Sequence, residues 1–394
     1  MLIAQVRRPA AARWLSKSTL AVSSQRALRL PAPRNNPIVA SAFGSPRPCP
    51  QYQPRSILKY DQRRAFLTAL PTVLVPPVVF TGLLLALWTY KCFMTVVFQE
   101  KILYMSYMPP QTRSEKIEDY AVTCKPVEWE QRRIKSLDGT NVSLAVGSIP
   151  LKDTAATLKP DKEVVICYFQ GNGGSTPPRL PLLSNTLKLL HSRASSESVC
   201  HTMVALSYRG YWTSSGRATE AGIKLDAQAA LAWVKENHPD ASIVLWGQSL
   251  GAGVACAAAA EHLAKSDAQK LQGLVLETPF TSVKSMLLAL YPERWLPYRY
   301  LAGFLRSHWD SEQALIRVSD LRENYSPDLS VLLVAATRDE VVPAEEAGKI
   351  QNVCKQAKLP IERVNVIGAL HNEATTRREG QEAVARFILN PEKE

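Results

Sequence analysis

Two residue types that build metal and redox sites are scarce in this chain of 394 residues. It has six histidines and seven cysteines, and no two cysteines form a C-x-x-C pair. Scattered cysteines in odd number argue against a disulfide framework, and they lack zinc-ligand spacing. Cys167 and Cys256 fall in apolar segments and are expected to be buried free thiols. We therefore expect no metal site and no cofactor.

Acidic residues are absent from the first 60 positions. Residues 1–64 hold twelve basic residues and one acid, Asp61, whereas residues 65–394 hold 35 basic and 34 acidic residues. The leader thus carries +11 of the net charge of +12. The remainder is nearly neutral, which gives little support to binding of nucleic acid.

The leader, residues 1–64, is rich in arginine, serine, alanine and proline, and residues 1–20 can form a short basic amphipathic helix. This composition is typical of an organellar transit peptide, most simply a mitochondrial one. The alternative is a disordered cytosolic tail before a membrane anchor. An early apolar core of the kind that a secretory signal needs is missing.

One uncharged run of 26 residues, 65–90, follows the leader and ends at Lys91. It is long enough to cross a hydrocarbon core of about 30 Å, so we predict a transmembrane segment over 65–98. Prolines in its first half would kink the helix, which makes 77–98 the better span. A buried core helix is the alternative.

The basic leader predicts the orientation of this single span. Positive charge stays on the cytosolic or matrix side, so residues after the span are expected across the membrane. We expect a single-pass protein of a mitochondrial membrane, with the endoplasmic reticulum or another endomembrane as the alternative.

Residues 99–126 are expected to form a juxtamembrane linker, and residues 127–394 the globular domain. Two apolar-rich runs at its start flank Asp138-Gly139, which is a strong hairpin signal. Short apolar strands then alternate with helices, and this alternation predicts an α/β fold with a mostly parallel sheet and helices on both faces. Strands are expected at 127–136, 142–148, 164–169, 203–206, 243–246, 274–276, 331–335 and 364–367, and helices at 180–190 and 223–234.

Residues 242–260 have the pattern of a buried strand, a tight turn and a helix of small residues. The turn is Gly247-Gln248-Ser249-Leu250-Gly251, a G-x-S-x-G. A serine on such a turn is held in strained backbone geometry with its hydroxyl directed away from the sheet. Ser249 is therefore a candidate nucleophile, and a plain tight turn in a Rossmann-like sheet is the alternative.

A serine nucleophile needs a base and an acid that orients it, and both are expected at the carboxyl ends of parallel strands. His371 alone among the histidines follows the last expected strand. Asp339 follows the strand before it, and its neighbour Glu340 could take its place. The order Ser249, Asp339, His371 is the chain order of an α/β-hydrolase triad.

Backbone donors for an oxyanion form the third requirement. One is expected at the N–H of Leu250, directly after the nucleophile. The other is expected from the glycine-rich loop Gln170–Gly174, with Asn172 as the first choice and Gly171 as the alternative. The loop could also cradle a phosphate, but no P-loop lysine or dinucleotide spacing follows it.

Several stretches in the same order resemble the α/β-hydrolase superfamily, and specifically its membrane-anchored domain-containing proteins with an N-terminal transmembrane helix. The resemblance spans residues 160–390, approximately, and implies serine-dependent hydrolysis of esters, thioesters or lipids through Ser249, Asp339 and His371. The stretches are YFQGNGG (168–174), SYRGYWTSSGRATEAGIKLDAQAALAWV (207–234), GQSLG (247–251), LETPFTSV (276–283), RDEVVP (338–343) and GALHNE (368–373).

The chain departs from that family at Gln170, where histidine usually precedes Gly171, and at Trp212, where a smaller residue usually follows Tyr211. Gln170 and Gly171 shape the oxyanion loop, and the indole of Trp212 is expected to narrow the pocket. We therefore assign Gln170, Gly171, Tyr211 and Trp212 to the substrate site.

Residues 283–329 are too many for a plain connection between two strands. They carry many aromatic and aliphatic residues, Trp295 and Phe304 among them, and predict a helical lid with an apolar underside that contacts an acyl substrate. Packing of the lid on the sheet is the alternative role for these side chains.

The sequence therefore predicts a membrane-anchored serine hydrolase whose partners are an apolar acyl or ester molecule and the lipid bilayer. A serine peptidase of the same fold and a non-catalytic membrane scaffold are the competing hypotheses.

Overall fold

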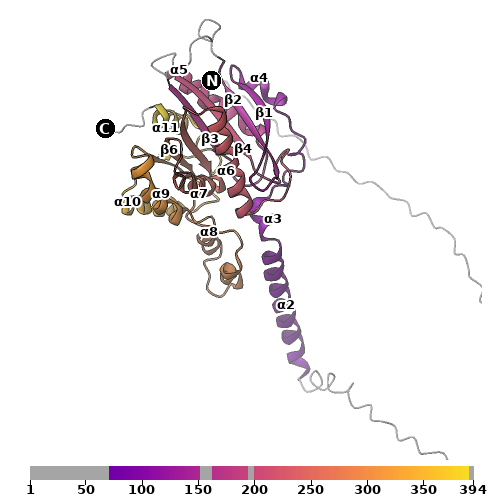
Figure 1. Cartoon of the computed structure of the whole chain (residues 1–394). Coiled ribbons are helices and arrows are strands. Elements are labelled where there is room, and N and C mark those ends of the chain that lie inside the picture. Colours follow the sequence, from indigo (N-terminus) through magenta and orange to yellow (C-terminus); the bar gives the residue numbers. More distant parts are fainter. Residues whose placement is uncertain (1–70, 151–161, 194–198, 390–394) are drawn as a thin grey trace, which may run out of the picture. The chain divides into compact units, whose positions relative to one another are not determined.

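The computed structural model describes residues 71–150, 162–193 and 199–389 (Figure 1). The leader, residues 1–64, and the start of the predicted membrane segment, residues 65–70, lie outside the described residues. The transit-peptide hypothesis thus stays a prediction.

An eight-stranded sheet forms the centre of the domain (Figure 1), in the order β1-β2-β4-β3-β5-β6-β7-β8. β2 is antiparallel to β1 and to β4, and the other neighbouring pairs are parallel. The predicted mostly parallel sheet and the hairpin at Asp138-Gly139 are confirmed. The strands are β1 Glu128–Lys135, β2 Asn141–Ser148, β3 Lys162–Phe169, β4 Val199–Ser207, β5 Ser242–Gln248, β6 Leu271–Glu277, β7 Ser330–Ala336 and β8 Ile361–Val366.

Helices cover both faces of the sheet. Successive residues of a strand point to opposite faces, so each strand contributes side chains to two separate cores. Cys167 lies in one core with side chains of α6, α7, α9 and α10. Its neighbour Tyr168 lies in the other core, with side chains of α5 and α11. Cys167 and Cys256 are buried free thiols, as predicted. The helices are α5 Leu180–Arg193, α6 Glu220–Asn237, α7 Leu250–Leu263, α9 Ser311–Tyr325, α10 Ala344–Gln356 and α11 Arg378–Leu389.

The apolar helix α2, Val75–Val97, follows the short 3-10 helix η1, Thr72–Leu74. Residues 72–97 are long and apolar enough to cross a membrane, and the apolar window is not buried, which argues against a core helix. The helix begins at Val75, two residues before the span of 77–98 that the prolines suggested. Pro76 and Pro77 lie in the first turn of α2, where the N–H that proline lacks has no partner within the helix.

Residues 99–126 contain α3 (Gln99–Tyr104), η2 (Glu118–Tyr120) and α4 (Ala121–Cys124). Tyr104, Ile117 and Cys124 are buried together with the residues of the sheet cores. The segment expected as a linker thus packs against the domain along much of its length.

Between β6 and α9 the chain forms α8, Val283–Leu290, and the 3-10 helix η4, Pro297–Phe304. α9 itself packs in the core and buries Leu315 and Val318. The predicted lid, residues 283–329, therefore divides into a helix of the domain layer and residues 283–309, which we call the insertion.

Candidate active site

Ser249 connects β5 to α7 with a φ of 51°, a conformation that non-glycine residues rarely adopt. Its N–H donates to the carbonyl of Glu277 at 2.8 Å, which fixes the turn to β6. A Cβ on Gly251 would lie 1.9 Å from the carbonyl oxygen of Phe169, and one on Gly247 would lie 2.1 Å from that of Gly251. Only glycine fits at both positions, so the sequence dictates the tight turn that holds Ser249 in its strained conformation.

Asp339 and His371 form a hydrogen-bonded pair. Nδ1 of His371 lies 2.8 Å from Oδ2 and 3.0 Å from Oδ1 of Asp339, and both side chains are nearly buried. Oδ1 of Asp339 also accepts from the amides of Val341 and Val342, at 2.9 and 2.8 Å. Burial raises the pKa of Asp339, but the hydrogen bonds from His371 and the two amides outweigh it and hold the pKa below its ordinary value. A charged carboxylate at Nδ1 leaves Nε2 as the nitrogen available for proton transfer.

Glu340, the alternative to Asp339, bonds to the backbone of His371, whereas Asp339 bonds to its imidazole. The carboxylate of Glu340 accepts from the N–H of His371 at 3.0 Å. Ser249, Asp339 and His371 follow β5, β7 and β8, which run parallel across β6, so all three lie at one edge of the sheet. The structure therefore gathers the predicted triad residues at the edge where active sites of parallel sheets form.

Glu277, at the end of β6, is a residue of this region that the sequence interpretation missed. Its buried carboxylate accepts from Nε1 of Trp246 at 3.1 Å and from the hydroxyl of Thr375 at 2.7 Å. Burial raises its pKa, and these hydrogen bonds oppose the rise in part. Glu277 thus links β5 to the loop that follows His371. An acidic residue at the end of the apolar run LVLE was the signal that could have found it.

The glycine-rich loop after β3 lies against the nucleophile. A Cβ on Gly171 would lie 3.6 Å from Cβ of Ser249. The amides of Gly173 and Gly174 donate to the carbonyls of Tyr104 and Met108, at 2.9 and 2.8 Å. These two amides are occupied by the segment after α2, so the amides of Gly171 and Asn172 stay as the candidate oxyanion donors of this loop.

Tyr104, the last residue of α3, joins three parts of the structure. Its carbonyl accepts from Gly173 and from the hydroxyl of Tyr211. Its own hydroxyl lies 2.8 Å from Oγ of Ser307 and accepts from Nε1 of Trp309 at 3.0 Å. Tyr104 therefore ties the continuation of the apolar helix to the oxyanion loop and to the end of the insertion.

Two buried glutamines flank the candidate nucleophile. Gln170 accepts through its side chain from Thr176 at 3.2 Å, and Gln248 accepts from Tyr168 at 3.2 Å and from Arg179. Nε2 of each is buried without a hydrogen-bond partner. Gln170 stands where the family resemblance predicts histidine. Its side chain holds the loop through the hydrogen bond from Thr176.

Tyr211 and Trp212 are buried and bind the segment after α2. The hydroxyl of Tyr211 donates to Tyr104, and Nε1 of Trp212 donates to the carbonyl of Glu115 at 2.7 Å. These contacts give both side chains a packing role, and their part in substrate binding stays a prediction.

Trp295 and Phe304 lie on the insertion with 66% and 63% of their surface exposed. The ring of Trp295 contacts the ring of Trp88 in α2, with centroids 5.9 Å apart. The carbonyl of Phe304 accepts from the side chain of Gln99 at 3.0 Å. Both predicted substrate residues therefore lie beside the apolar helix.

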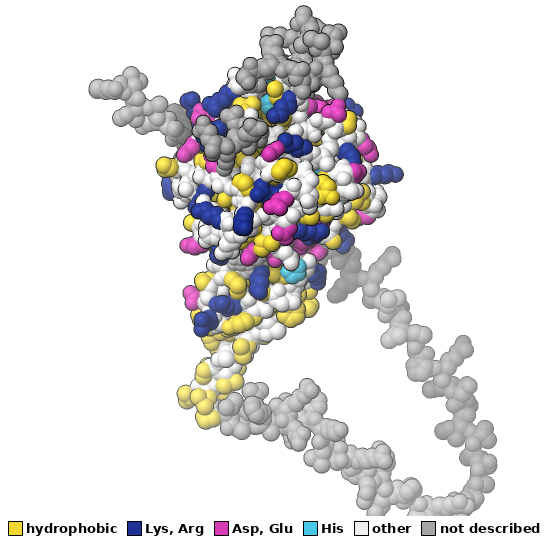
Figure 2. All heavy atoms as spheres, turned by 60° about the vertical axis from the view of Figure 1, so that its left-hand side comes forward, with side chains coloured by type: hydrophobic (Ala, Val, Ile, Leu, Met, Phe, Trp, Pro, Cys, Tyr) yellow, Lys and Arg dark blue, Asp and Glu magenta, His cyan; other side chains and the backbone are white. Residues whose placement is uncertain are grey.

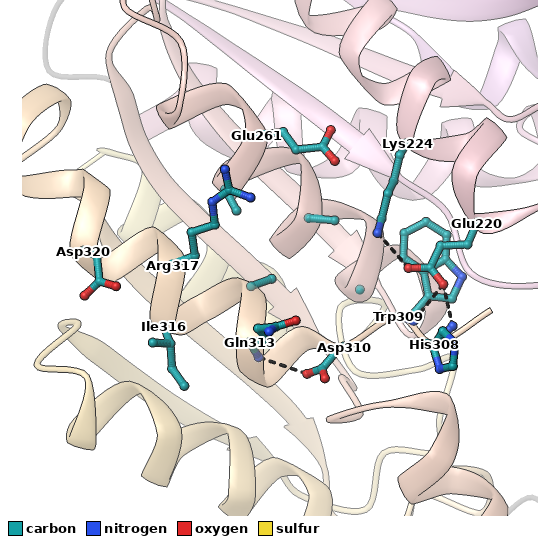
Figure 3. A pocket seen from close by; sticks show the side chains of 14 residues that line it. Glu220, Lys224, Glu261, His308, Trp309, Asp310, Gln313, Ile316, Arg317 and Asp320 are labelled. Atoms are coloured by element: carbon teal, nitrogen blue, oxygen red, sulfur yellow. Dashed lines mark hydrogen bonds and ion pairs between the residues drawn. The ribbon is translucent and has the colours of Figure 1, made fainter. Parts of the chain in front are cut away.

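A cavity of about 650 Å³ lies between α6, α7 and α9 (Figure 3). Glu220 in this cavity pairs with Lys224 at 2.8 Å and accepts from the amide of His308 at the end of the insertion. The residues that line it include none of the triad candidates, and Glu220 there anchors the insertion to α6. Within the described ranges, no three His, Cys, Asp or Glu side chains are grouped to hold a metal ion.

Comparisons with known proteins agree with this architecture. A family model described as alpha/beta hydrolase fold matches residues 192–308. Protein bem46 of Schizosaccharomyces pombe is 28% identical over 267 residues, which cover 66% of this chain and 76% of that protein. Lysophosphatidylserine lipase ABHD12 of Danio rerio is 30% identical over 201 residues, which cover 49% of this chain and 48% of that protein.

Among solved structures, an alpha-beta hydrolase from Vibrio vulnificus matches with a TM-score of 0.53 and 19% identity, over 73% of this chain and 90% of that one. At this identity the match shows the fold. The sheet order, the serine turn between β5 and α7, and the matched family model point the same way. The chain is therefore an α/β-hydrolase domain protein.

Proposed function

We propose that this chain is a membrane-anchored serine hydrolase that cleaves ester or thioester bonds of acyl or lipid-like substrates. The observation that carries the proposal is the hydrogen-bonded pair of Asp339 and His371 at the same sheet edge as Ser249 on its strained turn. The name of the zebrafish relative, a lysophosphatidylserine lipase, supports a lipid ester as the substrate class.

The chemistry follows from the roles of the three side chains. Nε2 of His371 takes the proton of Ser249 as Oγ attacks the substrate carbonyl carbon, and Asp339 stabilises the imidazolium. The amides of Leu250 and of Asn172 or Gly171 receive the oxyanion. Collapse of the intermediate breaks the bond to the alcohol or thiol, which leaves with the proton from His371. Water activated by His371 then hydrolyses the acyl-serine and releases the acid.

The membrane part of the proposal rests on α2. Residues 72–97 suffice for a span, and the apolar side chains of the helix face outward. The basic leader favours an orientation with the leader on the cytosolic or matrix side and the hydrolase domain across the membrane. A mitochondrial membrane remains the favoured location and the endoplasmic reticulum the alternative.

Labelling by a fluorophosphonate probe tests the catalytic proposal. The full chain in membranes and the matched variant Ser192→Ala, which alters an exposed serine of α5, should both be labelled. Ser249→Ala should not be labelled, and its ester turnover should fall at least about a thousandfold. A folded wild-type chain that resists labelling would instead favour a non-catalytic scaffold. Labelling with turnover of peptides but not esters would favour a serine peptidase.

A further inference from the structure

The insertion exposes large apolar side chains outside both sheet cores. Leu290, Trp295, Tyr300 and Phe304 are each more than 60% exposed. A lid whose apolar side chains closed over a substrate cleft would bury them against the domain. Exposure of four such side chains on one short segment indicates a surface that meets another apolar phase.

Contacts with α2 identify where this surface lies. Trp295 packs on Trp88, and Nζ of Lys91 lies 5.2 Å from the ring centre of Tyr298. Gln99, directly after α2, fixes the far end of η4, since its side chain donates to the carbonyl of Phe304 and accepts from the amide of Arg306 at 2.7 Å. η4 is thus held along the end of the apolar helix.

The position of Trp88 along α2 indicates how deep its contact with Trp295 lies in the membrane. Trp88 stands nine residues before Val97, the last residue of α2, which is about 14 Å along the axis at 1.5 Å per residue. Lys91, three residues after Trp88, is the only charged residue of α2. With Lys91 at the level of the headgroups, Trp88 and Trp295 lie just inside that level, where tryptophan and tyrosine gather in membrane proteins.

The charged residues of the insertion also agree with a position near the lipid headgroups. Arg294 and Arg306 are exposed beside the apolar residues, and Glu293 is the acidic residue between Leu290 and Arg306. Figure 2 shows hydrophobic and basic side chains gathered on the surface below the sheet domain. Apolar side chains flanked by arginines are typical of a segment that enters the headgroup region, because guanidinium groups bind phosphate.

We propose that the insertion is a second membrane-embedded element, which enters the phospholipid leaflet beside α2 on the side of the hydrolase domain. This inference rests on the proposed crossing of the membrane by α2. Phospholipid is the molecule that covers the apolar surface of the insertion, because acyl chains surround a spanning helix and the insertion extends along that helix. Since Ser307 and Trp309 at its end bond to Tyr104, which holds the oxyanion loop, the insertion links the leaflet to the site. The substrate is then an amphiphile resident in the leaflet.

Site-specific photocrosslinking in the full chain tests this proposal. The photoreactive residue p-benzoylphenylalanine replaces Tyr300 in the insertion, Phe80 in α2 or Leu137 in the β1–β2 turn, one at a time. All three positions are more than half exposed. The chains are reconstituted in vesicles of phosphatidylcholine with phosphatidylglycerol, irradiated, and analysed for lipid adducts by mass spectrometry. Retained fluorophosphonate labelling shows that each variant is folded.

Lipid adducts at positions 300 and 80, at least tenfold above position 137, are the expected result. Adducts at position 80 with position 300 no higher than position 137 would overturn the proposal and leave the membrane anchor intact. A crosslink from position 300 to a second copy of the chain would also overturn it. Absence of adducts at position 80 would contradict the anchor itself, and with it this inference.

Discussion

At the scale of single residues, the ionisation of Asp339 decides how the site responds to acid. Burial raises its pKa, but hydrogen bonds from His371, Val342 and Val341 lower the folded-state pKa below the ordinary value of about 3.9. A carboxyl with a lowered folded-state pKa stabilises the fold above the unfolded-state pKa. That stabilisation disappears as the pH falls through the lowered value.

Asp339→Asn should therefore affect both turnover and acid stability. At pH 7 we expect kcat to fall by about 10³- to 10⁴-fold, because the amide cannot hold the imidazole in the required tautomer or stabilise its charge. The melting temperature of the wild type should exceed that of the variant at neutral pH, and the gap should narrow below about pH 4. Calorimetry and ester assays across pH 3 to 8 measure both effects. The variant Asp320→Asn, at an exposed position of α9, serves as the control. A gap independent of pH would contradict the assignment.

Some residues of the site could be predicted from the sequence and others could not. Ser249 stands in a local pattern of five residues, and Asp339 and His371 follow expected strands, so order along the chain sufficed. Glu277 acts through partners 31 and 98 residues away, and Tyr104 through partners about 70 to 200 residues away. No period or spacing in the sequence encodes such contacts, because they depend on how strands and loops meet in space.

At the scale of elements, the turn between β5 and α7 is set by contact between backbones. Gly251 brings the start of α7 against the end of β3, and Gly247 brings the end of β5 against Gly251. Small residues along α7 continue this close approach, since Gly253 leaves room for the side chain of Trp309. The element that carries the nucleophile thus also holds the end of the insertion.

Gly251→Ala and Gly253→Ala should differ sharply. The first places a methyl group 1.9 Å from the backbone oxygen of Phe169, which cannot move without distorting β3. The second places it 3.1 Å from Cβ of Trp309, which a small shift relieves. We expect Gly251→Ala to cost more than about 3 kcal/mol of unfolding free energy and to abolish fluorophosphonate labelling, while Gly253→Ala costs about 1 kcal/mol. Denaturant unfolding in detergent measures both, and equal losses would show that the turn tolerates a side chain.

Elements with a clear apolar pattern were predictable, and their boundaries were less so. The strands and the hairpin lie where the apolar runs and Asp138-Gly139 place them. The prolines at 76 and 77 lie in the first turn of α2, where proline is accepted, so the helix begins two residues before the predicted span. The extent of the insertion escaped prediction, because the sequence pattern did not show that α9, inside the predicted lid, packs on α7.

At the scale of the whole molecule, charge and apolar surface are separated along the chain. Positive charge is concentrated in residues 1–64, apolar surface in α2, and the domain is nearly neutral. This arrangement predicts one orientation in the membrane. Because the positive-inside rule keeps the basic leader on the cytosolic or matrix side, the domain is expected on the other side of the membrane.

Protease protection tests that orientation. Protease added to sealed membranes from the side of the leader should remove the leader and leave a protected fragment that contains α2 and the hydrolase domain. Detergent should abolish the protection, which controls for intrinsic resistance of the fold. Digestion of the domain from the leader's side in sealed membranes would reverse the proposed orientation.

The hydrogen bonds of Tyr104 also determine where a soluble fragment of the chain can begin. A soluble fragment that starts at Val127 would lose the carbonyls that accept from Gly173 and Gly174, and would leave Trp309 and Tyr211 without their buried partner. A fragment that starts at Gln99 keeps α3 and discards the apolar helix and the residues before it. The practical boundary of the folded domain therefore lies between α2 and α3, 29 residues before the first strand.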